Sequence, residues 1–63
     1  MIGFEEVENK SSEDIYTMLE HEYADDEFAL EYITQRKNDP YYKTEEQKYQ
    51  AALGIVANAW IIF

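Results

Sequence analysis

Three stretches of the chain carry apolar residues at helical spacing, and each begins with a side chain that can cap a helix. The first opens at Ser11, with Asp14 three residues further on, in the spacing of a capping box. Its apolar residues then recur at i, i+3, i+4 and i+8 on one stripe: Ile15, Met18, Leu19 and Tyr23. This pattern predicts a helix over about residues 12–24.

The second stretch follows the pair Asp25-Asp26, which can end one helix and cap the next. Its apolar residues spread over a wide arc: Phe28, Ala29, Leu30, Tyr32 and Ile33. The segment ends at Asn38-Asp39-Pro40, because proline cannot continue a helix. We predict a helix over about residues 26–38.

The third stretch begins at a second capping box, formed by Thr44 and Gln47, and predicts a helix over about residues 45–62. Its expected core stripe recurs every three or four residues: Tyr49, Ala52, Leu53, Val56, Trp60 and Phe63. No alternation typical of strands occurs. The predicted fold is all-α: one domain, residues 1–63, built as a small three-helix up-down-up bundle, with residues 1–10 as a short N-terminal arm.

Composition favours a binding protein over an enzyme. The chain has no cysteine, and the single His21 lacks the second His or Cys that a structural zinc site uses. The order of residues in a calcium loop is missing, and two glycines cannot build a phosphate-binding loop. Ser11 and Ser12 are explained as helix caps. We therefore expect no metal, no cofactor and no catalytic residues.

The ends of the chain predict a soluble, cytoplasmic protein. The N-terminal stretch contains Glu5, Glu6 and Glu8 and lacks the basic region that opens a signal peptide. The longest apolar stretch, residues 51–63, is too short to span a bilayer. We expect no membrane partner.

Negative charge is concentrated in the first half of the chain. The net charge is −9, and eleven of the fourteen acids lie in residues 1–31, where Lys10 is the only base. Half of the acids lie at or near predicted helix starts, where the helix dipole favours them. The surplus suggests a surface for a basic partner. We predict that this acidic face has a central group and an extension, in that order: Glu20, Asp25, Asp26, Glu27 and Glu31, then Glu5, Glu6 and Glu8.

The third predicted helix has more apolar surface than two short helices can cover. From Gly54 to Phe63 only Asn58 is polar, and Ile61 falls opposite the expected core stripe. Three residues fall on a separate face and are candidates for self-association in a homodimer: Ala51, Ile55 and Ile62. The alternative is that the arm, through Ile2, Phe4 and Val7, wraps this helix. Tyr41 and Tyr42, in the loop after Pro40, are candidate interface aromatics.

Together these features predict a small acidic binding protein that inhibits a nucleic-acid-binding protein by occluding its basic surface. Its carboxylates would take the place of phosphates, and it would not bind nucleic acid itself. Phage anti-CRISPR and anti-restriction proteins are similar to it in size and charge, an analogy of class alone, and a phage protein would act in the host cytoplasm. The alternative is a homo-oligomeric structural or regulatory module that uses the apolar face of the third helix.

Overall fold

A computed structural model describes the whole chain, residues 1–63, as four helices without strands. The helices are α1 (Phe4–Val7), α2 (Ser12–Glu22), α3 (Glu27–Lys37) and α4 (Glu45–Ile62). The predicted all-α class is confirmed, and the three longer helices end within two residues of their predicted bounds. The short helix α1, in the predicted arm, was not expected, because four residues are too few to show a period.

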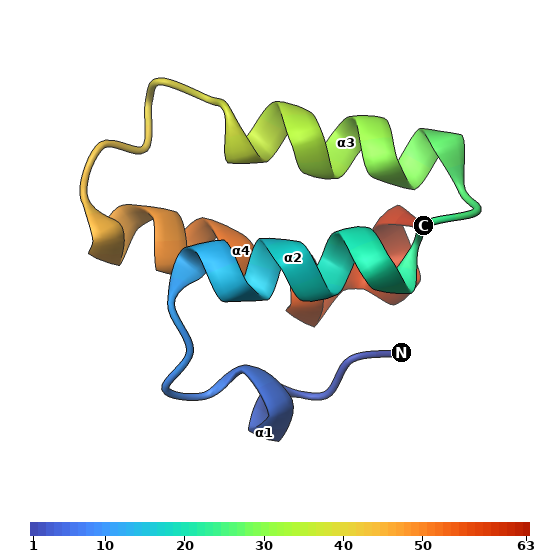
Figure 1. Ribbon diagram of the computed structural model, residues 1–63, viewed down its shortest axis with the longest axis horizontal. Helices are drawn as coiled ribbons and strands as arrows, with labels where there is room; N and C mark the ends of the chain where they lie inside the picture. Colours follow the sequence, from blue (N-terminus) through green and yellow to red (C-terminus); the bar gives the residue numbers. More distant parts are fainter.

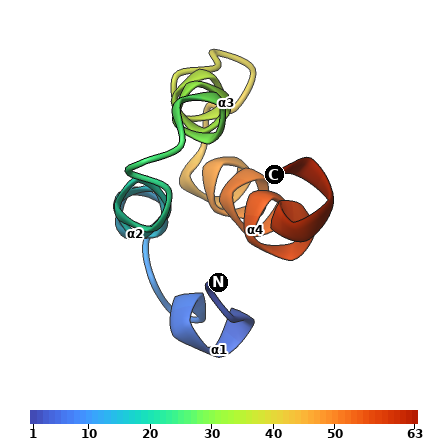
Figure 2. The ribbon, with the colours of Figure 1, turned by 90° about the vertical axis from the view of Figure 1, so that its right-hand side faces the viewer.

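The chain reverses direction between α2 and α3 and again between α3 and α4 (Figure 1). Seen from the end, α3 and α1 lie on opposite sides of α2 and α4, and α4 is inclined to α2 and α3 (Figure 2). Helix α4 packs against each of the other three helices. It is therefore the element around which the fold is arranged.

Side-chain caps fix where the three longer helices begin, as the sequence predicts. The hydroxyl of Ser11 accepts a hydrogen bond from the amide of Asp14, and the carboxylate of Asp26 accepts one from the amide of Ala29. At the start of α4, the Thr44 hydroxyl and the Gln47 side chain each accept a hydrogen bond from the other residue's amide. Each cap satisfies an amide that the helix leaves without a partner.

The core is small and draws on all four helices. Four large side chains are almost wholly buried, one or two from each of the first three helices: Val7, Ile15, Leu19 and Ile33. Helix α4 presents a stripe of mostly small residues to them: Ala52, Ile55, Val56 and Ala59. The two alanines on this stripe allow the other helices to approach the α4 backbone closely.

The rotation of α4 about its axis differs from the prediction in two residues. Trp60, predicted in the core stripe, is 71% exposed, and Ile55, predicted on a separate face, is 3% exposed and belongs to the core. The second half of α4 is apolar on nearly every side, so its pattern does not define which side is buried. Ile61 is 64% exposed, as expected from its position opposite the core.

The N-terminal arm packs on α4 and covers part of its surplus apolar surface. Val7 is fully buried in the core, and the half-buried Ile2 packs against it. The chain then turns at Asn9, whose φ of 66° is a left-handed conformation that Asn tolerates better than most residues. The arm is therefore an ordered part of the fold, but it leaves Trp60 and Ile61 exposed.

Two isoleucines on α4 test this rotation as a matched pair. We expect Ile55→Asp to unfold the protein, because burying an unpaired carboxylate costs several kcal/mol, about the whole stability of a domain this small. Ile61→Asp should leave the helical circular dichroism spectrum and the midpoint of thermal unfolding nearly unchanged. A folded Ile55→Asp protein would show that α4 is rotated differently.

Gly54 lies inside α4 without a packing reason in this fold. A Cβ atom added there would meet no atom within 4 Å beyond its chain neighbours and the backbone of its own helix. We expect Gly54→Ala to raise the free energy of unfolding by about 0.5–1 kcal/mol, because glycine loses more backbone entropy in a helix than alanine does. Ala57→Gly, on the same exposed side, should lower it by a similar amount. Urea denaturation measures both, and a loss of stability in Gly54→Ala would contradict the open space.

Candidate functional site

The structure separates the predicted acidic residues into two groups. Glu20, Asp25, Asp26, Glu27 and Glu31 lie along the end of α2, the connection to α3 and the first half of α3. Glu5, Glu6 and Glu8 belong to α1 and its C-terminal cap, on the opposite side of the molecule from α3 (Figure 2). The second group therefore does not extend the first as one continuous row, contrary to the prediction.

The first group, with Glu22 added, forms one end of the molecule, which we call the acidic end: Glu20, Glu22, Asp25, Asp26, Glu27 and Glu31. Four of these carboxylates, including Glu22, already have partners within the chain. Glu20 pairs with Lys37 at 3.5 Å, Asp26 caps α3, and Glu31 accepts a hydrogen bond from Gln35. Asp25 and Glu27 are exposed and have no hydrogen bond or ion pair, so their charges are fully available to a partner.

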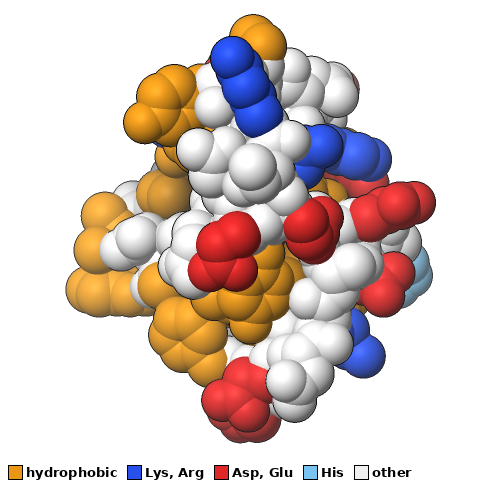
Figure 3. All heavy atoms as spheres, turned by 90° about the vertical axis from the view of Figure 1, so that its left-hand side faces the viewer, with side chains coloured by type: hydrophobic (Ala, Val, Ile, Leu, Met, Phe, Trp, Pro, Cys, Tyr) orange, Lys and Arg blue, Asp and Glu red, His pale blue; other side chains and the backbone are white.

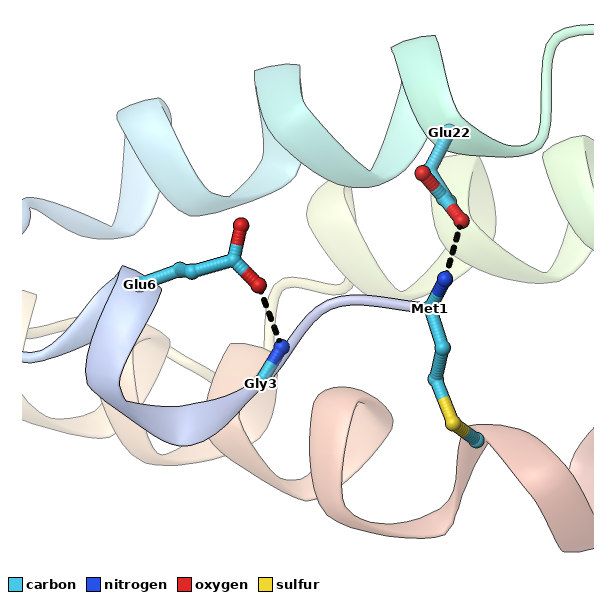
Figure 4. Close-up of polar contacts among 4 residues, drawn as sticks. All are labelled: Met1, Gly3, Glu6 and Glu22. Atoms are coloured by element: carbon cyan, nitrogen blue, oxygen red, sulfur yellow. Dashed lines mark hydrogen bonds and ion pairs between the residues drawn. The ribbon is translucent and has the colours of Figure 1, made fainter.

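Glu22 binds the N-terminal amine. The distance from the Met1 nitrogen to Glu22 Oε2 is 2.7 Å, and Figure 4 shows Met1 between α2 and the last turns of α4. The carboxylate raises the pKa of this amine. In the same segment, Glu6 accepts a hydrogen bond from the amide of Gly3 at 2.7 Å, which caps α1 (Figure 4). Two of the arm's polar contacts thus use the carboxylates of Glu6 and Glu22 within the chain.

The backbones of all five lysines and arginines lie toward the other end of the molecule, and the Lys37 side chain reaches back to pair with Glu20. They lie just before or in the first turns of α2 and α4, and at the end of α3. These three helix ends lie on the left of Figure 1, and the five residues are Lys10, Arg36, Lys37, Lys43 and Lys48. Five acids lie at the same helix ends: Glu13, Asp14, Asp39, Glu45 and Glu46. We call this the mixed end, and Figure 3 shows both signs of charge on it. The five positive and five negative charges of the mixed end cancel. The net charge of −9 therefore comes from the nine acids of the acidic end, of α1 and of its C-terminal cap.

Glu45 joins two helix starts at the mixed end. Its carboxylate accepts hydrogen bonds from the Ser12 amide at 2.7 Å and from the Ser12 hydroxyl at 3.0 Å. These donors lower the pKa of the Glu45 carboxyl from its ordinary value. Along the sequence Glu45 is one of the acids at the start of a predicted helix, and no local pattern links it to a residue 33 positions away.

Tyr41 and Tyr42 lie near the mixed end, away from the acidic end. Their rings meet edge to face with centroids 5.1 Å apart, and Tyr41 is 72% exposed. They line a shallow depression with Gln50 and Ala51 of α4. The structure therefore does not bring these aromatics together with the predicted acidic row, and their interface role stays a prediction.

The predicted self-association face is mostly inaccessible. Ile55 is buried in the core, and Ala51 and Ile62 are half-buried. The exposed apolar side chains of α4 are instead Trp60 and Ile61. The exposure of Trp60 was not predicted, since Trp60 was assigned to the core stripe. The one signal for an exposed apolar surface here was the absence of charge from Tyr49 to the end of the chain.

Tyr16 is buried and His21 is exposed. Burial raises the pKa of Tyr16, whose hydroxyl is enclosed and has no hydrogen-bond partner. His21 is exposed, and no three His, Cys, Asp or Glu side chains gather closely enough to hold a metal ion. None of the four helices combines the length and apolar character needed to cross a bilayer.

Comparison with known proteins gives no further guide. No protein-family model, curated protein or solved structure matches the chain.

The contact between Glu45 and Ser12 predicts a specific pH dependence of stability. Because the pKa of Glu45 is lower in the folded protein than the ordinary 4.5, its contribution is present above that value and is lost as pH falls through the folded pKa. We expect Glu45→Gln to be less stable than the unmutated chain at pH 7, with a difference that shrinks below about pH 4. Urea denaturation across this pH range measures the difference. Glu46→Gln, in the same helical turn, is the control, and an equal effect there would contradict a role for the Ser12 contact.

Proposed function

We propose that the chain is a small acidic binding protein that inhibits a nucleic-acid-binding protein by occluding its basic surface. The observation that carries this proposal is the separation of charge along the molecule. Six carboxylates gather at the acidic end, where the only cations paired with them are Lys37, with Glu20, and the N-terminal amine, with Glu22, while the charges of the mixed end cancel. Carboxylates in such a group can replace the phosphates that a basic surface normally binds.

The size of the molecule keeps this separation effective in solution. The longest extent of the chain is 29 Å, and the two ends lie along that axis (Figure 1). Exposed charges are screened beyond about 8 Å at physiological ionic strength. The lysines of the mixed end therefore do little to neutralise Asp25 and Glu27, and a positive surface attracts the acidic end first.

On this proposal the chain catalyses no reaction, needs no metal or cofactor, and does not bind nucleic acid directly. It acts in the cytoplasm, which is the host cytoplasm if a phage encodes it. Its class would be that of phage anti-CRISPR and anti-restriction inhibitors, with which it shares small size, helical structure and acidity.

The second candidate is a homo-oligomeric module, and the exposed Trp60 and Ile61 favour it. It would require a dimer that buries Trp60 and Ile61, on the outward side of α4, in place of the predicted Ala51, Ile55 and Ile62. The charge distribution opposes this candidate, because a second copy offers no surface of net positive charge to the acidic end or to α1.

A pair of variants with equal net charge tests the proposed function. The first neutralises the acidic end by Asp25→Asn, Glu27→Gln and Glu31→Gln, and leaves Asp26 in place because it caps α3. The second removes the same number of charges at the mixed end by Glu13→Gln, Asp14→Asn and Glu46→Gln. Both should keep the helical circular dichroism spectrum.

Each protein is immobilised and exposed to lysate of the native host at low salt. We expect the unmutated chain and the mixed-end variant to retain the same proteins, which then elute with raised salt and with added duplex DNA. The acidic-end variant should retain several-fold less protein, because it lacks the charges that make salt-sensitive contacts with a basic surface. Equal retention by both variants, or proteins that duplex DNA does not displace, would contradict the proposal.

A further inference from the structure

Phe28 is a large apolar side chain in the first turn of α3 that the core does not use. It is 65% exposed, whereas its neighbour Ala29 is fully buried. Helix α3 lies at one edge of the molecule, with α2 and α4 on one side only, so no other helix covers its outer surface (Figures 1 and 2). A single exposed aromatic ring is common on protein surfaces, and its surroundings decide whether it has a role.

A small hollow lies beside the Phe28 ring. It has a volume of about 120 Å³ and is lined by four side chains of α3: Phe28, Glu31, Tyr32 and Gln35. These positions follow one another at i, i+3, i+4 and i+7, the spacing that places residues on one face of a helix. Two of its walls are aromatic, and the carboxylate of Glu31 is the only charged group among them. We call it the Phe28 hollow.

The negative charge at the Phe28 hollow is oriented and available. Glu31 Oε1 accepts a hydrogen bond from Gln35 Nε2 at 3.3 Å, which holds the carboxylate along the helix and leaves Oε2 without a partner. Glu27 precedes Glu31 by one turn on the same side of α3, is exposed and forms no ion pair. Two carboxylates of α3 therefore lie close together here, and a positive charge between them would relieve their repulsion.

The cations of α3 leave the Phe28 hollow open. Lys37 lies half a turn around the helix from Phe28 and pairs with Glu20 of α2. The Arg36 guanidinium lies 5.1 Å from the centroid of the Tyr32 ring and donates a hydrogen bond to the Tyr32 hydroxyl at 3.3 Å. Arg36 is about 12 Å from Phe28 along the helix axis. One aromatic ring of α3 thus already holds a guanidinium, and the Phe28 ring holds none.

We propose that the Phe28 hollow binds an arginine side chain of the partner protein. The guanidinium plane stacks on the Phe28 ring, and its N–H groups donate hydrogen bonds to the carboxylate of Glu31, with Glu27 as a second negative charge nearby. This inference rests on the proposed function, because the arginine belongs to the basic surface that the acidic end occludes.

Charge and shape together select arginine over the other occupants. A guanidinium is planar and weakly hydrated, so it can stack on a ring and pair with a carboxylate at the same time, whereas the lysine ammonium is compact and strongly hydrated. A neutral apolar side chain would desolvate Glu31 without compensating its charge. A second copy of the chain has a single arginine, Arg36, which already contacts Tyr32 of its own chain.

Short peptides of equal length made of arginine, lysine or citrulline test the inference, since citrulline keeps the planar group without its charge. Each is titrated into the unmutated chain at about 0.15 M salt, where attraction between distant charges is screened. NMR shifts of the Phe28 ring and of the amides of residues 27–35 give the dissociation constants. We expect the arginine peptide to bind about two- to fivefold tighter than the lysine peptide, the range of an exposed cation–π contact.

The citrulline peptide should bind more weakly than both charged peptides. Equal binding of the arginine and lysine peptides, or arginine binding that leaves the Phe28 ring signals unchanged, would overturn the inference. Citrulline binding as tight as arginine binding would also overturn it, because the hollow would then take a neutral side chain.

Two variants with the same chemical change locate the binding. Phe28→Leu keeps an apolar side chain and removes the ring, so the arginine and lysine peptides should bind equally, and Phe28→Tyr should restore the preference. Phe4→Leu removes a ring that is 50% exposed on α1, next to Glu5, and should keep the preference for arginine. Circular dichroism checks that each variant stays helical. A preference that persists in Phe28→Leu, or is lost equally in Phe4→Leu, would contradict the assignment to the Phe28 hollow.

Dilution of the chain without peptide tests the second copy as occupant. Phe28 ring signals that change on dilution would overturn the inference in favour of self-association, and constant signals support it. These measurements compare arginine with lysine and use no nucleic-acid-binding protein, whereas the retention experiment compares variants that lack carboxylates. The preference for arginine can therefore fail while the retention result stands, and the reverse.

Discussion

Packing of one narrow side of α4 against the other three helices determines most of what this molecule presents to solvent. The chain has 63 residues and buries only eleven of them, so the buried side chains of α4 are a large share of the core. Burying Ala52, Ile55, Val56 and Ala59 requires that residues half a turn away point outward. The exposure of Trp60 and Ile61 is thus a direct result of how the core is formed.

The sequence predicted the local features of the fold well. The caps at Ser11, Asp26 and Thr44 depend on residues three positions apart, and such contacts form within a single turn. The rotation of α4 depends instead on which side the other helices occupy. Since alanine, isoleucine and tryptophan follow one another on every side of its second half, Ile55 and Trp60 were interchanged in the prediction.

The candidate site was predictable in composition but not in arrangement. Counting charges along the chain showed a surplus of acids in residues 1–31. It could not show that the return of α3 brings Arg36 and Lys37 to the starts of α2 and α4, where five acids cancel five bases. Nor could it show that α1 lies on the far side from α3, which divides the expected row of carboxylates (Figure 2).

The contact of Glu45 with Ser12 has a consequence for anions in general. The start of a helix offers free amides that commonly bind phosphate or sulfate. At α2 that position is filled by a carboxylate of the same chain, tethered at a high effective concentration and held by the Ser12 amide and hydroxyl. A free phosphate would have to displace this internal anion, so the start of α2 is closed to the ligands that such positions usually attract.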